Sequence, residues 1–249
     1  MLLLSLNIRT FGSSNDSKIR EFKRLIRKIK PSFIALQETK LHRVNEFWVR
    51  GIWGSNYCQI LQKEMVGKSG GQLIIWDSTL FIATDSYICD HFIGVRGKWA
   101  SNGAPCIFIN VYGPHNDPDK IRMWDSLSAF IKKYEDEACV VCGDFNEVRN
   151  QDERLNCDFN ASRARKFNDF ITGNNLIDLP MGGRKFTRVS DDGLKFSKLD
   201  RFLINDHFNL MWSILSVIAL ERSLSDHCPI ILKDIEKNFG PKPTRVFDE

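Results

Sequence analysis

Short apolar runs of strand length that adjoin polar clusters constrain the fold of this chain more than any other feature. The clusters are Asn7 after residues 2–6, Gln37-Glu38 after 33–36, Gly143-Asp144-Phe145-Asn146 after 139–142, and Ser225-Asp226-His227 before 228–232. Polar residues that close three strands and open a fourth meet at one rim of a sheet when the fourth strand runs antiparallel to the others. Converging carboxylates, amides and an imidazole at such a rim are typical of an active site.

The length and composition fit one large globular domain or two small ones. The 249 residues are 43% hydrophobic and 27% charged, a balance typical of a folded domain, and they contain no internal repeat. The apolar runs are too short for a transmembrane helix, so we expect no membrane contact. Residues 1–6 lack a basic leader and a cleavage site, which favours a buried first strand over a secretory signal.

The cysteines favour a reducing compartment. Seven cysteines cannot all pair within the chain, and their spacing suggests no disulfide scaffold. Cys139 and Cys142 have the spacing of a redox or zinc half-site, but positions i and i+3 of a strand point to opposite faces. We therefore expect both to be buried core residues.

Most of the formal charge of +4 lies in one segment, because residues 16–30 alone carry a net charge of +5. Ile19, Phe22, Ile26 and Ile29 recur there at helical spacing, which predicts an amphipathic helix with a basic outer face. A solvated face is the preferred interpretation of this charge, and a DNA-binding stripe is the alternative.

Further elements follow from periodicity and turn residues. We expect helices over 118–134 and 162–173, strands over 72–76, 107–112 and 215–220, and a hairpin whose arms, 186–189 and 195–204, flank the turn Ser190-Asp191-Asp192-Gly193. Most strand-to-strand spacings lack room for regular βα alternation, so we predict an α+β fold with mixed or antiparallel sheets. The domain is expected to span residues 1–235, and residues 236–249 to form a linker-like tail.

The polar clusters supply what hydrolysis of a phosphodiester needs, namely charge neutralisation, an activated water and help for the leaving oxygen. Glu38 and Asp226 are carboxylates of the kind that hold Mg²⁺. Asp200 is placed to orient the imidazole of His227, as in a triad. Asp144 and Asn146 are two residues apart, so in a regular strand their side chains face the same side.

The order of these motifs resembles the exonuclease III-like endonuclease/exonuclease/phosphatase superfamily over residues 2–232. The matching segments contain Asn7, Gln37-Glu38-Thr39, Asn110-Val111-Tyr112-Gly113-Pro114, Gly143-Asp144-Phe145-Asn146, Lys198-Leu199-Asp200-Arg201-Phe202 and Ser225-Asp226-His227-Cys228-Pro229. Within it, residues 37–41, 69–71 and 152–154 are most similar to the apurinic-type endonuclease domain of non-LTR (LINE) retrotransposons. The tail at 239–243 resembles the segment that joins such a domain to a reverse transcriptase.

The resemblance implies a DNase I-like fold, a four-layer α/β sandwich of two mixed or antiparallel sheets flanked by helices. It implies catalytic roles for Asn7, Glu38, Tyr112, Asp144, Asn146, Asp200, Asp226 and His227. Of these, Glu38 is the main expected Mg²⁺ ligand, with Asn7 and Asp226 close to the ion or its waters. The DNA-binding residues that it implies, together with charged neighbours in the hairpin, are Arg9, Thr187, Arg188, Lys195 and Lys198.

One position departs from the family, which usually has Asp or Asn two residues after Asn7, where this chain has Arg9. If Arg9 points into the site, we expect a direct contact with phosphate and a weaker affinity for metal.

The function expected from the resemblance is nicking of double-stranded DNA by a monomer that uses Mg²⁺ or Mn²⁺ and leaves a 3′-hydroxyl. Such a protein would be intracellular, and nuclear if it acts on genomic DNA. Two alternatives stay open at this point: a small-molecule or lipid phosphate hydrolase on the same fold, and an inactive domesticated remnant that binds nucleic acid without cutting it.

Overall fold

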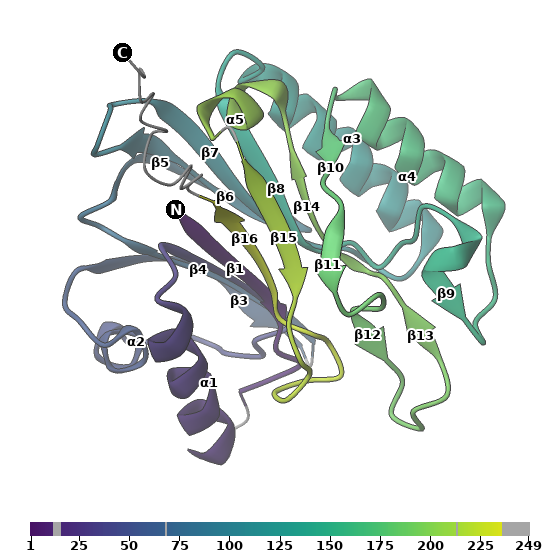
Figure 1. The fold of residues 1–249 in the computed structure, drawn as a ribbon, viewed down its shortest axis with the longest axis horizontal. Coiled ribbons are helices and arrows are strands. Elements are labelled where there is room, and N and C mark those ends of the chain that lie inside the picture. The colour runs from purple at the N-terminus through teal and green to yellow at the C-terminus, as the bar shows by residue number, and fades with distance from the viewer. Residues whose placement is uncertain (12–15, 68, 213, 236–249) are drawn as a thin grey trace, which may run out of the picture.

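The strands form two large sheets that pack face to face, as the computed structural model in Figure 1 shows. The structure describes residues 1–11, 16–67, 69–212 and 214–235, so the predicted tail 236–249 lies outside the described residues. No helix within these described ranges is long and apolar enough to cross a membrane.

The first sheet contains the two strands that open the chain and the strand that ends the described part. Its order is β11 (Met181–Gly183), β15 (Leu215–Ala219), β16 (Ile230–Asp234), β1 (Leu2–Asn7), β2 (Phe33–Gln37), β4 (Ser69–Asp77) and β3 (Cys58–Val66). β1 and β2 are parallel, whereas β16 pairs with β1 antiparallel. The polar residues after β1 and β2 and those before β16 therefore lie at one rim, as the sequence predicted.

The second sheet brings its own polar residues to a rim in the same way. Its order is β10 (Ile177–Asp178), β14 (Asp200–Ile204), β8 (Ala138–Asp144), β7 (Pro105–Tyr112), β6 (Phe92–Trp99) and β5 (Phe81–Ile88). The parallel pair β7–β8 sets Tyr112 opposite Asp144, and the antiparallel pair β8–β14 sets Asp200 opposite Asp144. A small third sheet consists of β12 (Arg188–Val189), β13 (Phe196–Ser197) and β9 (Arg154–Leu155).

Helices cover the outer face of each large sheet, which confirms the predicted four layers (Figure 1). α1 (Asp16–Ile29) and α2 (Glu46–Trp53) pack on the first sheet, and α3 (Asp117–Lys133) and α4 (Ala161–Gly173) on the second. The remaining helices are the 3₁₀ turn η1 (Gln151–Glu153) and the short α5 (Asp206–Met211). The basic helix is amphipathic as predicted, since Phe22 and Ile26 are buried while Arg20, Arg24 and Arg27 are exposed.

The core between the sheets is mainly aliphatic and contains an aromatic cluster in which Phe33 stacks on Phe108 at a centroid distance of 3.7 Å. Cys139 and Cys142 are both buried and free, and they belong to different core clusters on opposite faces of β8. The prediction that they are core cysteines is therefore confirmed.

The structure differs from the prediction in the second arm of the hairpin, which was expected to run from 195 to 204. This arm is divided by a break in the strand into β13 and β14. β13 pairs with β12 and β9, while β14 joins β8 in the other sheet. At the break, the hydroxyl of Thr187 accepts hydrogen bonds from the backbone N–H groups of Leu199 (2.9 Å) and Asp200 (3.0 Å). The break therefore turns Asp200 onto the rim.

Candidate active site

A buried line of three ionisable side chains crosses the rim of the second sheet. His227 Nδ1 lies 2.8 Å from Asp200 Oδ2, and His227 Nε2 lies 3.7 Å from Asp144 Oδ2. All three side chains are almost fully buried. Because a carboxylate can only accept, His227 donates its Nδ1 proton to Asp200 and presents Nε2 toward Asp144.

The charges of this line are set by burial and by one another. Burial lowers the pKa of His227, but the charges of Asp200 and Asp144 outweigh burial and raise this pKa to about 9. Burial raises the pKa of Asp144 to about 6, against the opposing effects of His227 and of its hydrogen bonds. The imidazolium and the Asp144 carboxylate are therefore the neutral-pH forms of the two groups.

Both oxygens of Asp144 accept hydrogen bonds that fix the carboxylate. Asn7 Nδ2 donates to Oδ2 at 2.9 Å, and the backbone N–H of Asn146 donates to Oδ1 at 2.9 Å. Asn146 has the left-handed φ of +51°, and its side-chain Nδ2 donates to the carbonyl of Gly113 at 2.7 Å. Asn7 and Asn146 thus hold Asp144 from two sides.

Glu38 and Tyr112 form the other half of the rim. Glu38 directly follows β2 with φ of +53°, and its half-buried carboxylate lies close enough to the hydroxyl of Tyr112 to raise the pKa of that hydroxyl. Burial, together with the charges of Glu38 and Asp144, raises the pKa of Tyr112 well above its ordinary value. Tyr112 is therefore a neutral phenol that can donate a hydrogen bond.

Asp226 lies beside two guanidinium groups at the mouth of the site. Arg188 Nε lies 3.4 Å from Asp226 Oδ2, and Arg9 Nη1 lies 3.8 Å from the same oxygen. Arg9 also makes a two-nitrogen contact with Asp191 at the hairpin tip, including Nη2 to Oδ2 at 2.8 Å. Arg9 therefore points across the rim rather than away from it.

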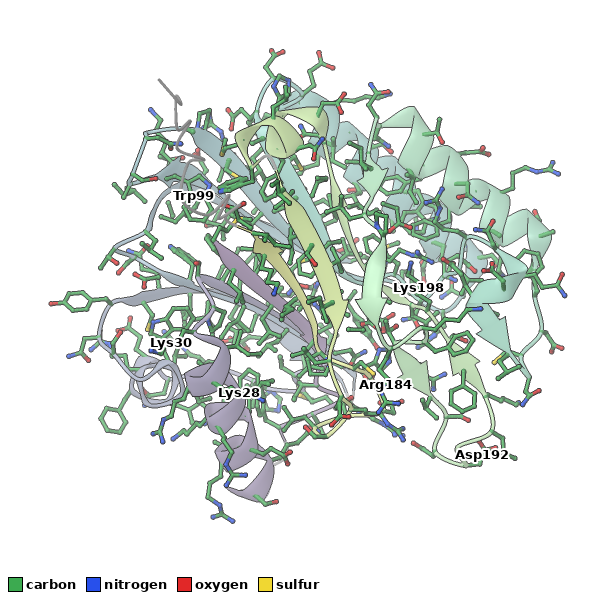
Figure 2. The ribbon with its side chains drawn as sticks, in the orientation of Figure 1. Lys28, Lys30, Trp99, Arg184, Asp192 and Lys198 are labelled. Carbon is green, nitrogen blue, oxygen red and sulfur yellow. The ribbon has the colours of Figure 1, made fainter. Side chains whose placement is uncertain are left out.

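The hairpin residues predicted to meet DNA fall into different environments. Arg188 is half-buried at the site and Lys195 is exposed, whereas Thr187 is fully buried and holds the break before Asp200. Lys198 is mostly buried, 3.7 Å from Glu153, and burial lowers its pKa. Figure 2 shows Lys198 well above the hairpin tip that carries Asp192.

The oxygen donors at the rim fit a hard divalent cation. Glu38 and Asp226 offer carboxylates at the rim, and Asp144, Asp200 and His227 have ligand atoms within 4.8 Å of one another. Asp200 Oδ1 is buried and has no hydrogen-bond partner among the residues that the structure describes. Since His227 Nδ1 is engaged by Asp200, the free donors are mainly oxygens, which suit Mg²⁺ or Mn²⁺ better than a soft metal.

The buried ion pair between Lys120 and Glu147, next to Asn146, was not predicted from the sequence. Lys120 on α3 donates to Glu147 Oε2 at 2.6 Å and to the carbonyl of Asn146 at 2.6 Å, and both charged side chains are buried. A lysine on an amphipathic helix is usually solvated, so no local signal marked Lys120. The pair supports the backbone that carries Asn146.

A second buried network of ion pairs links β14, which begins at Asp200, to the small third sheet. Arg201, directly after Asp200 and fully buried, pairs with Glu153 and with Asp178, the latter at 2.7 Å. Glu153 belongs to the 152–154 segment that the sequence singled out, and its carbonyl accepts from the backbone N–H of Lys198 at 2.9 Å. The network therefore ties η1 and β9 to the start of β14.

Comparison with known proteins places this geometry in a family. The profile of the Endonuclease/Exonuclease/phosphatase family matches residues 4–227. The Transposon TX1 uncharacterized 149 kDa protein of Xenopus laevis is 28% identical over 132 residues, which is 50% of this chain and 10% of that protein. The chain thus spans about a tenth of the length of this relative.

Solved structures agree on the fold. The AP endonuclease LMAP from Leishmania major superposes with a TM-score of 0.74 at 13% identity, covering 93% of this chain and 86% of that one. The endonuclease domain of TRAS1, a telomere-specific non-LTR retrotransposon, gives 0.68 at 12% identity, covering 95% and 99%. The predicted resemblance and the DNase I-like fold are therefore confirmed, and this chain belongs to the endonuclease/exonuclease/phosphatase family.

Proposed function

We propose that this chain is a divalent-metal-dependent endonuclease that nicks double-stranded DNA and leaves a 3′-hydroxyl. The observation that carries the proposal is the buried line Asp200–His227–Asp144, which meets Glu38 and Asp226 at one rim. A fixed imidazolium beside a carboxylate that can orient water suits attack on a phosphodiester. The similarity to a transposon protein and to the endonuclease domain of a retrotransposon supports DNA as the substrate.

In this proposal, each side chain at the rim has a distinct task. Asp144 orients the attacking water and takes up its proton, while Asn146 holds the water or a phosphate oxygen. His227, held by Asp200, stabilises the negative charge that develops on the phosphate. Tyr112 donates its hydroxyl to a phosphate oxygen, because its raised pKa keeps it protonated.

Glu38 would be the main ligand of the divalent cation, with Asn7 and Asp226 close to the ion or its waters. When bound, the ion would neutralise charge on the phosphate and on the leaving oxygen. The basic residues Arg9, Arg188 and Lys195 lie next to this rim or on the hairpin beside it, and they would contact the DNA backbone.

A supercoiled-plasmid assay with Mg²⁺ tests the proposal. We expect His227→Ala to reduce nicking by roughly 10²–10³-fold, the usual loss when a group that stabilises transition-state charge is removed. The matched control is His207→Ala, because His207 is an exposed histidine on α5, at the opposite end of the molecule from the hairpin (Figure 1). A polymerase should extend the nicked strand directly if the product carries a 3′-hydroxyl.

The same assay separates the alternatives. Equal nicking by the wild type and His227→Ala would remove the endonuclease proposal. Release of inorganic phosphate from inositol phosphates without nicking would favour a small-molecule phosphatase. DNA binding with neither activity would favour an inactive remnant.

A further inference from the structure

The hairpin formed by residues 188–197 is attached at its base to the loop that carries the catalytic imidazole. Arg188 and His227 form a β-bridge, and the backbone N–H of Val189 donates to the carbonyl of Asp226 at 3.0 Å. Cys228 donates from its backbone N–H to the carbonyl of Thr187 at 2.6 Å. The base of the hairpin is therefore fixed relative to the active site by the main chain.

The turn at the hairpin tip is held together by its own residues. Ser190 and Lys195 share a backbone hydrogen bond of 2.9 Å, and Asp192 accepts from the backbone N–H of Leu194 at 3.0 Å. Among the described residues, two side chains from outside hold this turn. Asn156 donates to the carbonyl of Leu194 at 2.9 Å, and Arg9 binds Asp191 with both terminal nitrogens.

Arg9 reaches the hairpin tip from the catalytic rim itself. Its backbone N–H donates to Asn7 Oδ1 at 2.9 Å, and its guanidinium lies 3.8 Å from Asp226. Its φ of +58° lies in the left-handed region, which Asn and Asp adopt far more readily than Arg. The side chain thus spans from the strand end that carries Asn7 to a hairpin distant in sequence.

We propose that Arg9 is a positioning residue that holds the tip of the 188–197 hairpin over the catalytic rim through Asp191 and thereby helps to decide which duplex shapes are nicked. This role in target choice rests on the proposed endonuclease function. The second arm of the hairpin is held by β9 and by Asn156, which lie on the side of the hairpin away from Asn7 in sequence and sheet. Arg9 adds a contact from the rim to Asp191 at the tip, and this contact sets the distance between the tip and the rim. That distance sets how well the hairpin matches the width of a DNA groove.

Amide hydrogen exchange of the metal-free protein tests the anchor without any nuclease activity. Arg9→Asn and Asp191→Asn remove the same ion pair from opposite ends, and Asn suits the left-handed backbone at position 9. We expect amide exchange in a peptide covering 188–197 to become about two- to fivefold faster in both variants. This is the change in the opening equilibrium that the loss of one exposed ion pair produces.

The matched control is Arg184→Asn, since Arg184 is an exposed arginine that lies 3.4 Å from Glu221, away from the hairpin turn (Figure 2). Asp191→Glu should preserve the wild-type exchange, because it keeps the carboxylate. Unchanged exchange in both Arg9→Asn and Asp191→Asn, or a change in only one of them, would overturn the proposal.

Mapping of nick positions on a long end-labelled duplex tests the consequence for target choice. Arg9→Asn and Asp191→Asn should share one altered distribution of nicks, while Asp191→Glu and Arg184→Asn keep the wild-type distribution. An unchanged distribution in the first two variants would overturn the role in target choice. If the wild type itself does not nick, the endonuclease proposal fails, whereas the exchange experiment still decides whether Arg9 anchors the hairpin.

Discussion

At the scale of single residues, the chemistry of this rim depends on buried ionisable groups that control one another. Asp200 and Asp144 flank the His227 ring, and their charges overcome the effect of burial on its pKa. A histidine with a raised pKa in the folded state stabilises the fold fully below its unfolded pKa near 6.5. This contribution is lost as the pH rises through about 9.

The protonation of His227 gives a direct prediction at this scale. In the metal-free protein, an NMR titration of the His227 ring should show a pKa near 9. Asp200→Asn removes the larger of the two raising charges, so the pKa should fall by roughly 1–3 units. The control Asp206→Asn changes an exposed carboxylate on α5 and should leave the pKa of His227 unchanged. An identical titration in Asp200→Asn would contradict the assigned pairing.

At the scale of elements, the register between β7 and β8 decides that Tyr112 and Asp144 are neighbours. Gly143, just before Asp144, has φ of +136°, and a Cβ atom there would lie 2.0 Å from the carbonyl oxygen of Val111. Such an approach requires glycine, because the obstacle is the backbone of the neighbouring strand. The glycine in the Gly-Asp-Phe-Asn motif is therefore a requirement of strand packing.

Gly143→Ala should consequently destabilise the fold by about 1–3 kcal/mol, as overpacking in a core does. Gly173→Ala is the matched control, because Gly173 ends α4 with open space around its Cα, and alanine there should be neutral or stabilise by about 0.5–1 kcal/mol. Urea unfolding of the three proteins measures both effects. Equal urea midpoints for Gly143→Ala and the wild type would show that β7 and β8 can move apart without loss of folding free energy.

At the scale of the whole molecule, the two sheets and their helices form the core of the part of the chain that the structure describes. The last strand, β16, pairs with β1 and β15, and Ile235 donates from its backbone N–H to the carbonyl of Ile214 at 2.8 Å. The core cluster between the sheets includes Val217, Ile230 and Leu232 from these last strands. Residues 1–235 therefore supply the packing on which the rim depends.

A chain of residues 1–235 should fold with an unfolding midpoint within about 2–4 °C of the full chain, the shift that roughly 1 kcal/mol produces at this size. Its nicking activity should match that of the full chain in the same Mg²⁺ buffer. A calorimetric scan measures the midpoint. A larger fall in the unfolding temperature would mean that residues 236–249 pack on the domain, which would contradict the prediction that they form a linker.

The sequence by itself determined the rim and most of the layers. Asn7, Glu38, Asp144 and His227 each adjoin a predicted strand, so the sequence predicted that they converge if the last strand runs antiparallel to the others. The helices α1, α3 and α4 follow from apolar spacing, because each buries one face on a sheet. The order of the motifs, read as a resemblance, supplied the four-layer fold.

The edge strands and the contacts between distant charges were decided only by the tertiary structure. β3 and β5 lie at the edges of the two sheets and bury few side chains, so they lack the apolar alternation that marks a strand. The pairs Lys120–Glu147 and Arg9–Asp191 join residues 27 and 182 positions apart. Such pairs form because packing brings the elements together, and no local pattern specifies the partner of a charged side chain.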